Sequence, residues 1–199
     1  VAVVILSQPG RLNAISTAMW REIAQLFAGL SADSTVRCVI VRGSGAHFSA
    51  GADITEFPGQ RTDADALYHY HQRIIAPTLR AVGDCPHPTI ALIEGTCLGG
   101  GLAIACQCDL RLAGVSARLG APIRHLGFPM APEEVCTLLR IAGRSVTLEM
   151  LLEGRVFTAH EAAAKGLVTR VIGDAVVVDE AYRSAADIAA GAALVNRIN

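Results

Sequence analysis

The sequence predicts an α/β fold with largely parallel strands, because short β-branched runs alternate with stretches of helical periodicity. The connections between successive strands are long enough for the right-handed crossovers that parallel strands require. Glycine-rich turns directly follow two of the predicted strands. We therefore expect a single domain over residues 1–199, with a core over about 1–140 and a mostly helical part over about 141–199.

Two strands and two long helices are expected in the first part of the chain. In order they are the strand Val1–Leu6, a helix from Ser16 to Leu30, the strand Val36–Val41 and the helix Ala64–Val82. Ser16 is a preferred N-cap residue, and the apolar side chains after it recur at helical spacing. Thr62 or Asp63 could cap the second helix in the same way.

The second part of the chain begins after Cys85-Pro-His-Pro88, because proline disfavours helix at and before its own position. Pro132 stands where proline is tolerated, in the first turn of a helix. The expected strands are Thr89–Ile93, Leu110–Ala113 and Val168–Ile172. The expected helices are Gly101–Cys108, Glu133–Ala142, Thr147–Leu152, His160–Lys165 and Glu180–Ala190.

Composition excludes several classes of protein. With 52% hydrophobic residues and a net charge of −1, the chain is too apolar and too weakly charged to remain disordered. The 17 Lys and Arg are balanced by 18 Asp and Glu, so no basic surface for nucleic acid is expected. No window reaches the ~18 consecutive apolar residues of a membrane span. Cys38, Cys97 and Cys106 lie in apolar runs, which suits buried, reduced thiols and a cytoplasmic location.

The two glycine-rich turns are the strongest candidates for chemistry. They span Gly43–Ile54 and Gly95–Leu102, each after a predicted strand and before a predicted helix start. Such turns leave backbone N–H groups unpaired at the positive end of a helix, where an anion or an oxyanion can bind. The alternative is that the glycines merely close tight turns. Neither turn matches a phosphate-binding or dinucleotide-binding fingerprint, whereas two of them could supply one N–H each to a single carbonyl oxygen.

Several segments resemble, in chain order, the enoyl-CoA hydratase/isomerase (crotonase) superfamily. They are PGRLNAI at Pro9–Ile15, FSAGADI at Phe48–Ile54, GTCLGGG at Gly95–Gly101, CDLR at Cys108–Arg111 and GRVFTAHEAAAKGLV at Gly154–Val168. One such motif is weak evidence, but five in the same order span nearly the whole chain.

The resemblance implies a spiral of β-β-α turns and an acyl-CoA thioester as the small-molecule substrate, with CoA as part of the substrate and no separate cofactor. The thioester oxygen would be held by the backbone N–H groups of Ala52 and Gly100. Substrate contacts are expected from Ala50, Gly51, Ala52, Asp53, Ile54, Gly99 and Gly100. The family also implies a homotrimer or hexamer and further C-terminal helices, so the chain is expected to be shortened.

The sequence departs from the family pattern at the two acidic positions. Ala103 and Ile123 stand where the resemblance places catalytic glutamates, and we expect both to face one apolar pocket. Neither side chain can activate water or deliver a proton, so the usual hydratase and isomerase mechanisms are not available. The remaining acid–base candidates are His125, Glu133 and Glu134. Each has a simpler explanation: His125 as a packing or surface residue, and the two acids as a favourable helix N-terminus.

Two hypotheses about function therefore stay open. The first is an enzyme of the lyase/isomerase kind that stabilises a thioester enolate with an unusual acid–base group. The second is a non-catalytic pseudoenzyme that only binds acyl-CoA, because binding and oxyanion stabilisation use the same N–H groups. No metal site is expected, since His69 and His71 are two positions apart and would not share a helix face.

Overall fold

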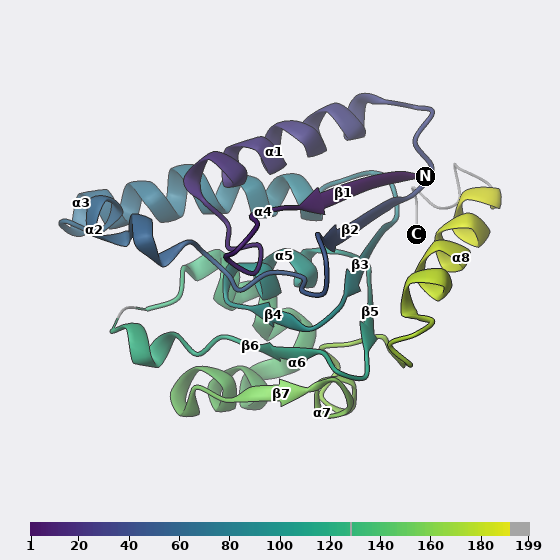
Figure 1. The fold of residues 1–199 in the computed structure, drawn as a ribbon. Coiled ribbons are helices and arrows are strands. Elements are labelled where there is room, and N and C mark those ends of the chain that lie inside the picture. Colours follow the sequence, from purple (N-terminus) through teal and green to yellow (C-terminus); the bar gives the residue numbers. More distant parts are fainter. Residues whose placement is uncertain (128, 192–199) are drawn as a thin grey trace.

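The computed structural model describes residues 1–127 and 129–191 (Figure 1). Its large sheet has five strands in the order β1-β2-β3-β5-β8, and every neighbouring pair is parallel. These strands are β1 (Ala2–Leu6), β2 (Val39–Gly43), β3 (Thr89–Ile93), β5 (Leu110–Gly114) and β8 (Arg170–Ile172). The predicted α/β class with largely parallel strands is confirmed.

A smaller sheet contains three strands that sequence reasoning did not find. They are β4 (Thr96–Leu98), β6 (Arg118–Gly120) and β7 (Val156–Thr158), in the order β4-β6-β7. Two isolated parallel bridges extend this smaller sheet beyond β4: Ser49 pairs with Cys97, and Ile15 pairs with Ala52. The chain thus runs from β3 through β4 into α5 (Gly100–Gln107), and from β5 through β6 toward the next long helix. This repeat of strand, strand and helix is the expected spiral.

The first helices follow the predicted caps. In α1 (Thr17–Ala32), the Ser16 side chain accepts a hydrogen bond from the Met19 amide at 3.2 Å. Asp63 accepts one from the Ala66 amide at 2.8 Å and begins α3 (Ala64–His69). The expected helix over 64–82 is divided, because a π-helical segment, η2 (Tyr70–Ile75), separates α3 from α4 (Ala76–Gly83).

The two helices expected over 133–142 and 147–152 form a single element, α6 (Pro132–Glu153), which is kinked at Gly143. Gly143 has a φ of 75°, which residues with side chains rarely adopt. The kink at this glycine separates the two stretches of helical periodicity in the sequence. The remaining helical segments are η1 (Ile54–Glu56), α2 (Phe57–Gln60), η3 (Ile123–Leu126), α7 (Ala159–Ala164) and α8 (Val177–Ala190). In the described part of the chain, no helix is both long and apolar enough to cross a membrane.

The large sheet is covered on both faces, which explains why its strands are apolar throughout. On β3, Ile90 and Leu92 pack with α8, whereas the alternate residues Ala91 and Ile93 belong to the main core. Figure 1 shows α8 on one side of the sheet and α1 with α4 on the other. The thioester-binding candidates therefore sit on a scaffold with a core on each face.

The cysteines expected to be buried are buried. Cys38, Cys97 and Cys106 are each at most 1% exposed. Burial raises the pKa of the Cys106 thiol to about 11, so this group is protonated at neutral pH. These three thiols act as small apolar core side chains.

Leu92→Ala tests the packing between the sheet and α8. Leu92 is fully buried, so we expect the substitution to lower the free energy of unfolding by about 2–5 kcal/mol. The control is Leu152→Ala, whose side chain is 68% exposed and should change stability little. Denaturant unfolding of both variants measures this, and equal losses would contradict the two-faced core.

Candidate active site

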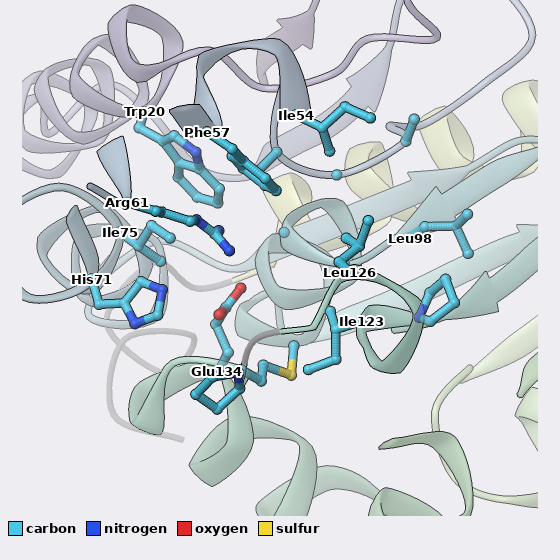
Figure 2. A pocket seen from close by; sticks show the side chains of 18 residues that line it. Trp20, Ile54, Phe57, Arg61, His71, Ile75, Leu98, Ile123, Leu126 and Glu134 are labelled. Carbon is cyan, nitrogen blue, oxygen red and sulfur yellow. The ribbon is translucent and has the colours of Figure 1, made fainter. Parts of the chain in front are cut away.

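A cavity of about 100 Å³ lies between the two glycine turns and the helical segments around them (Figure 2). Its wall is mostly apolar, with a few polar side chains. The lining residues are Trp20, Ala50, Gly51, Ala52, Ile54, Phe57, Arg61, His71, Ile75, Leu98, Gly99, Gly100, Pro122, Ile123, Leu126, Pro129, Met130 and Glu134. All of the expected substrate contacts except Asp53 are among them.

The two turns touch directly at Gly51. A Cβ atom on Gly51 would lie 2.9 Å from the Leu98 carbonyl oxygen and 3.4 Å from the Gly100 nitrogen. Gly51 also has a φ of 100°, so glycine is required there both for space and for conformation. The Leu98 amide donates a hydrogen bond to the Ser49 carbonyl at 2.9 Å, and this bond holds the two turns side by side.

The amides of Ala52 and Gly100 are neighbours in the cavity wall. In the bridge between Ile15 and Ala52, the Ile15 amide donates to the Gly51 carbonyl at 2.7 Å, and the Asp53 amide donates to the Ile15 carbonyl at 2.9 Å. In a parallel bridge of this kind the Ala52 N–H points away from Ile15. Gly100 is the first residue of α5, so its N–H has no acceptor within the helix. A Cβ on Gly100 would lie 3.5 Å from the Ala52 nitrogen.

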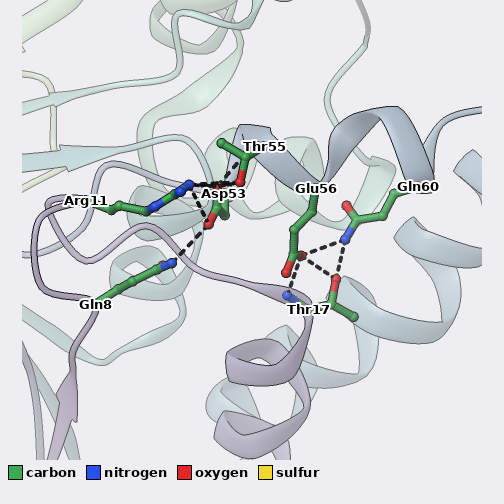
Figure 3. A network of polar contacts seen from close by, with 7 residues as sticks. All are labelled: Gln8, Arg11, Thr17, Asp53, Thr55, Glu56 and Gln60. Carbon is green, nitrogen blue, oxygen red and sulfur yellow. Dashed lines mark hydrogen bonds and ion pairs between the residues drawn. The ribbon is translucent and has the colours of Figure 1, made fainter.

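Asp53 supports the first turn from outside the cavity (Figure 3). Its carboxylate accepts hydrogen bonds from the Thr55 hydroxyl at 2.7 Å, from Arg11 at 3.0 Å and from Gln8 at 3.0 Å. The Thr55 hydrogen bond is the largest of the effects that lower the Asp53 pKa. The Asp53 carboxylate therefore holds the loop together, and the expected contact of its main chain with substrate stays a prediction.

A second network joins the turn to α1. The Glu56 carboxylate accepts hydrogen bonds from the Thr17 amide at 2.8 Å and the Thr17 hydroxyl at 2.7 Å. Gln60 donates to the same carboxylate at 2.8 Å (Figure 3). The carboxylate thus binds the N-terminus of α1 and fixes α2 beside it. This anchors the part of the cavity wall that carries Phe57 and Arg61.

Of the two acid–base candidates whose side chains the structure describes, Glu133 and Glu134, it is Glu134 that lines the cavity. It is the third residue of α6, and its carboxylate accepts a hydrogen bond from the Ala131 amide at 3.1 Å. Burial raises the pKa of Glu134 to about 7, although that hydrogen bond and the charge of Arg61 oppose the rise. Figure 2 shows the Glu134 carboxylate and the Arg61 guanidinium pointing toward each other. Glu134 thus lies both in the first turn of a helix and in the cavity wall, so its two predicted roles do not exclude each other.

The other expected positions are placed differently. Glu133 lies outside the cavity, where it accepts from Gln72 at 3.3 Å and pairs with Arg80 at 3.6 Å. The side chain of His125 lies outside the described part of the structure, although its backbone belongs to η3. Ile123 lines the cavity as expected. Ala103 is fully buried in the main core and is not among the lining residues, so the two vacant positions do not share one surface.

Sequence reasoning missed the helical side of the cavity. Trp20, Phe57, Arg61 and His71 all line it, and none belongs to a recognisable motif. Trp20 carried one available signal, because the chain's single tryptophan lies on the apolar stripe of a predicted helix. His71 carried a weaker signal, since it lies four residues from both Leu67 and Ile75 on the apolar face of the predicted helix. Among the described residues, no cluster of potential metal ligands is present.

The family is settled by comparison with known proteins. The chain matches the family Enoyl-CoA hydratase/isomerase over residues 1–198. The chain belongs to the enoyl-CoA hydratase/isomerase family. A crystal structure of an enoyl-CoA hydratase/carnithine racemase from Magnetospirillum magneticum superposes with a TM-score of 0.95 and 44% identity, covering 98% of this chain and 73% of that one. The predicted resemblance and the crotonase-like fold are therefore confirmed.

Relatives in this family have different catalytic activities. A mevalonyl-coenzyme A hydratase of Beauveria bassiana is 33% identical over 195 residues, which are 95% of this chain and 70% of the relative. The mitochondrial Δ(3,5)-Δ(2,4)-dienoyl-CoA isomerase of Mus musculus is 33% identical over 196 residues. That match covers 92% of this chain and 59% of the isomerase. Hydratases and isomerases both occur among the relatives of this family member.

Glu134→Gln should change how stability depends on pH. In the wild type, the unfolded chain loses this proton from about pH 4.5, while the folded state retains it up to about pH 7. Stability therefore falls as pH rises across this interval, by roughly 3 kcal/mol in total. The glutamine variant lacks that loss, so its stability relative to wild type should rise by this amount between pH 4.5 and 8. Urea unfolding at both pH values measures it.

The matched control for that experiment is Glu133→Gln on the same helical turn. Its carboxylate is half-buried and lies outside the cavity, so the wild-type pH dependence should persist. A Glu134→Gln variant with an unchanged pH dependence would contradict a buried carboxyl with a raised pKa.

Proposed function

We propose that this chain binds an acyl-CoA thioester with the carbonyl oxygen between the amides of Ala52 and Gly100. The observation that carries the proposal is the adjacency of two backbone N–H donors in the wall of one small cavity, neither of them used in a hydrogen bond between described residues. Such a pair polarises the thioester carbonyl and stabilises the enolate formed when a proton leaves Cα. Each donor typically stabilises the transition state by ~3 kcal/mol.

Glu134 is proposed as the acid–base group of this reaction. The cavity is small, so an acyl group bound at the two amides must lie near the Glu134 carboxylate. A pKa of about 7 supplies both the proton acceptor and the proton donor near neutral pH, which suits transfer to and from carbon. Because Ala103 and Ile123 carry no acid–base group, the two-carboxylate addition of water is not proposed.

The non-catalytic alternative uses the same amides for binding alone. One observation favours the enzyme: a carboxyl is held in a largely apolar cavity at a cost to stability, and such perturbed groups cluster at functional sites. We therefore propose an enzyme of the lyase/isomerase kind with CoA entering as part of the substrate. The homotrimer or hexamer and the cytoplasmic location stay predictions.

The thioester site is tested first on the protein, by removing the N–H of Gly100, and then on the ligand, by removing the carbonyl oxygen. Gly100→Pro deletes the N–H at a first helical position, where proline's backbone is tolerated. Gly100→Ala is the matched control, since its Cβ meets the same Trp20 ring at 2.7 Å but keeps the N–H. By calorimetry, butyryl-CoA should bind the proline variant at least tenfold more weakly than the alanine variant.

The ligand provides the complementary test. S-butyl-CoA, a thioether without the carbonyl, should bind wild type more weakly than butyryl-CoA and should not distinguish the two variants. Equal affinity of wild type for thioester and thioether would contradict the proposed oxyanion site.

Proton exchange separates the enzyme from the pseudoenzyme. In D₂O, an enzyme that forms the enolate should incorporate deuterium at Cα of butyryl-CoA, and mass spectrometry detects this without knowledge of the final product. We expect Glu134→Gln to slow exchange by ~10²–10⁴-fold and Glu133→Gln to leave it nearly unchanged. Hydration of crotonyl-CoA should stay well below about 10 s⁻¹. Absence of exchange in wild type that binds the thioester would support the pseudoenzyme.

A further inference from the structure

A group of three polar side chains stands out in the otherwise apolar cavity wall. Arg61, His71 and Glu134 reach it from three different elements: the end of α2, the π-helical segment and the first turn of α6. Figure 2 shows all three around the same part of the cavity, with Trp20, Ile75 and Ile123 near them. The thioester amides do not require these groups, because the glycine turns supply that site by themselves.

Arg61 is held in place rather than free on the surface. Its guanidinium stacks on the Phe57 ring at 3.6 Å from the centroid and lies 5.7 Å from that of Tyr70. The Glu56 network fixes α2 against α1 and so fixes the base of this side chain. Burial lowers the pKa of Arg61, yet a guanidinium stays protonated in proteins. The cavity therefore contains a permanent, partly buried positive charge.

A permanent positive charge is unfavourable beside a plain hydrocarbon acyl chain. Moving a charge out of water carries a penalty, and alkyl groups return none of it. A carboxylate offsets part of this penalty, because the planar guanidinium binds its two oxygens through parallel N–H donors. The chemistry of the wall is thus matched to an anionic group at the end of the acyl chain.

His71 adds a second donor at the same place. The π-helical segment carries both His71 and Ile75, and both line the cavity. Burial lowers the pKa of His71, so its imidazole is neutral at neutral pH and has one N–H to donate. A neutral donor beside a guanidinium is a common way to orient one carboxylate oxygen.

We propose that the acyl group of the substrate carries a carboxylate remote from the thioester, and that Arg61 binds this carboxylate with His71 donating beside it. The inference rests on the proposed function, because the thioester amides place the other end of the ligand. Glu134 does not oppose such a ligand while it is protonated, and burial, the largest effect on its pKa, favours that neutral form against the Ala131 hydrogen bond and the Arg61 charge.

The test compares CoA thioesters that differ only in the terminal group. Succinyl-CoA and butyryl-CoA have the same number of acyl carbons, and so do glutaryl-CoA and pentanoyl-CoA. Calorimetry with the wild-type protein should show at least tenfold tighter binding of the carboxylate member in at least one pair. Arg61→Met should reduce this ratio to near one, and Arg61→Lys should give an intermediate ratio, because lysine retains the charge but not the paired donors.

Arg73→Met is the matched control. Arg73 belongs to the same π-helical segment as His71 but is exposed and does not line the cavity, so the ratio should equal that of wild type. Circular dichroism of each variant establishes that it is folded before binding is compared.

The outcomes separate this inference from the proposed function. If wild type binds both members of each pair equally, or if Arg61→Met weakens both members to the same extent, Arg61 serves the cavity or Glu134 and the carboxylate site is refuted. The proposed function stands in both cases. If folded wild type binds no thioester at all, the proposed function fails and this inference fails with it.

Discussion

The contact between the two glycine turns is the constraint on which the rest of the site depends. At Gly51 the backbone of one turn meets the Leu98 carbonyl of the other so closely that a Cβ atom would lie 2.9 Å from it. The spiral makes this contact possible, because neighbouring parallel strands β2 and β3 end at the same edge and each continues into the second row of strands. Any side chain at Gly51 would separate the Ala52 amide from the Gly100 amide.

The acidic groups around this contact divide into two kinds. Asp53 and Glu56 accept several hydrogen bonds each and hold the first turn to its neighbours. Glu134 accepts a hydrogen bond from the Ala131 amide and lines the cavity, and burial is the largest effect on its pKa, which it raises. Carboxylates with many partners stabilise the framework, whereas the one with few partners retains a proton that can be exchanged.

The sequence predicted the parts of this site that are made of backbone. The two glycine turns follow from glycines after predicted strands, and the family resemblance then indicates Ala52 and Gly100 within them. The caps Ser16 and Asp63 follow from local chemistry. The helical wall could not be predicted in the same way. Arg61 lies at the end of α2, which the Glu56 network fixes against α1 through residues distant in the sequence. Long-range packing of this kind leaves no periodic signal.

The proposed reaction moves one negative charge across the cavity. When Glu134 takes the Cα proton, the charge passes from its carboxylate to the thioester oxygen, where two amides and the N-terminus of α5 receive it. Arg61 opposes this step, because its positive charge stabilises the Glu134 carboxylate and lowers the Glu134 pKa. A carboxylate on the substrate would neutralise that effect and make Glu134 a stronger base. The group that binds the substrate would thereby also activate the base, and only when the matching acyl group is in place.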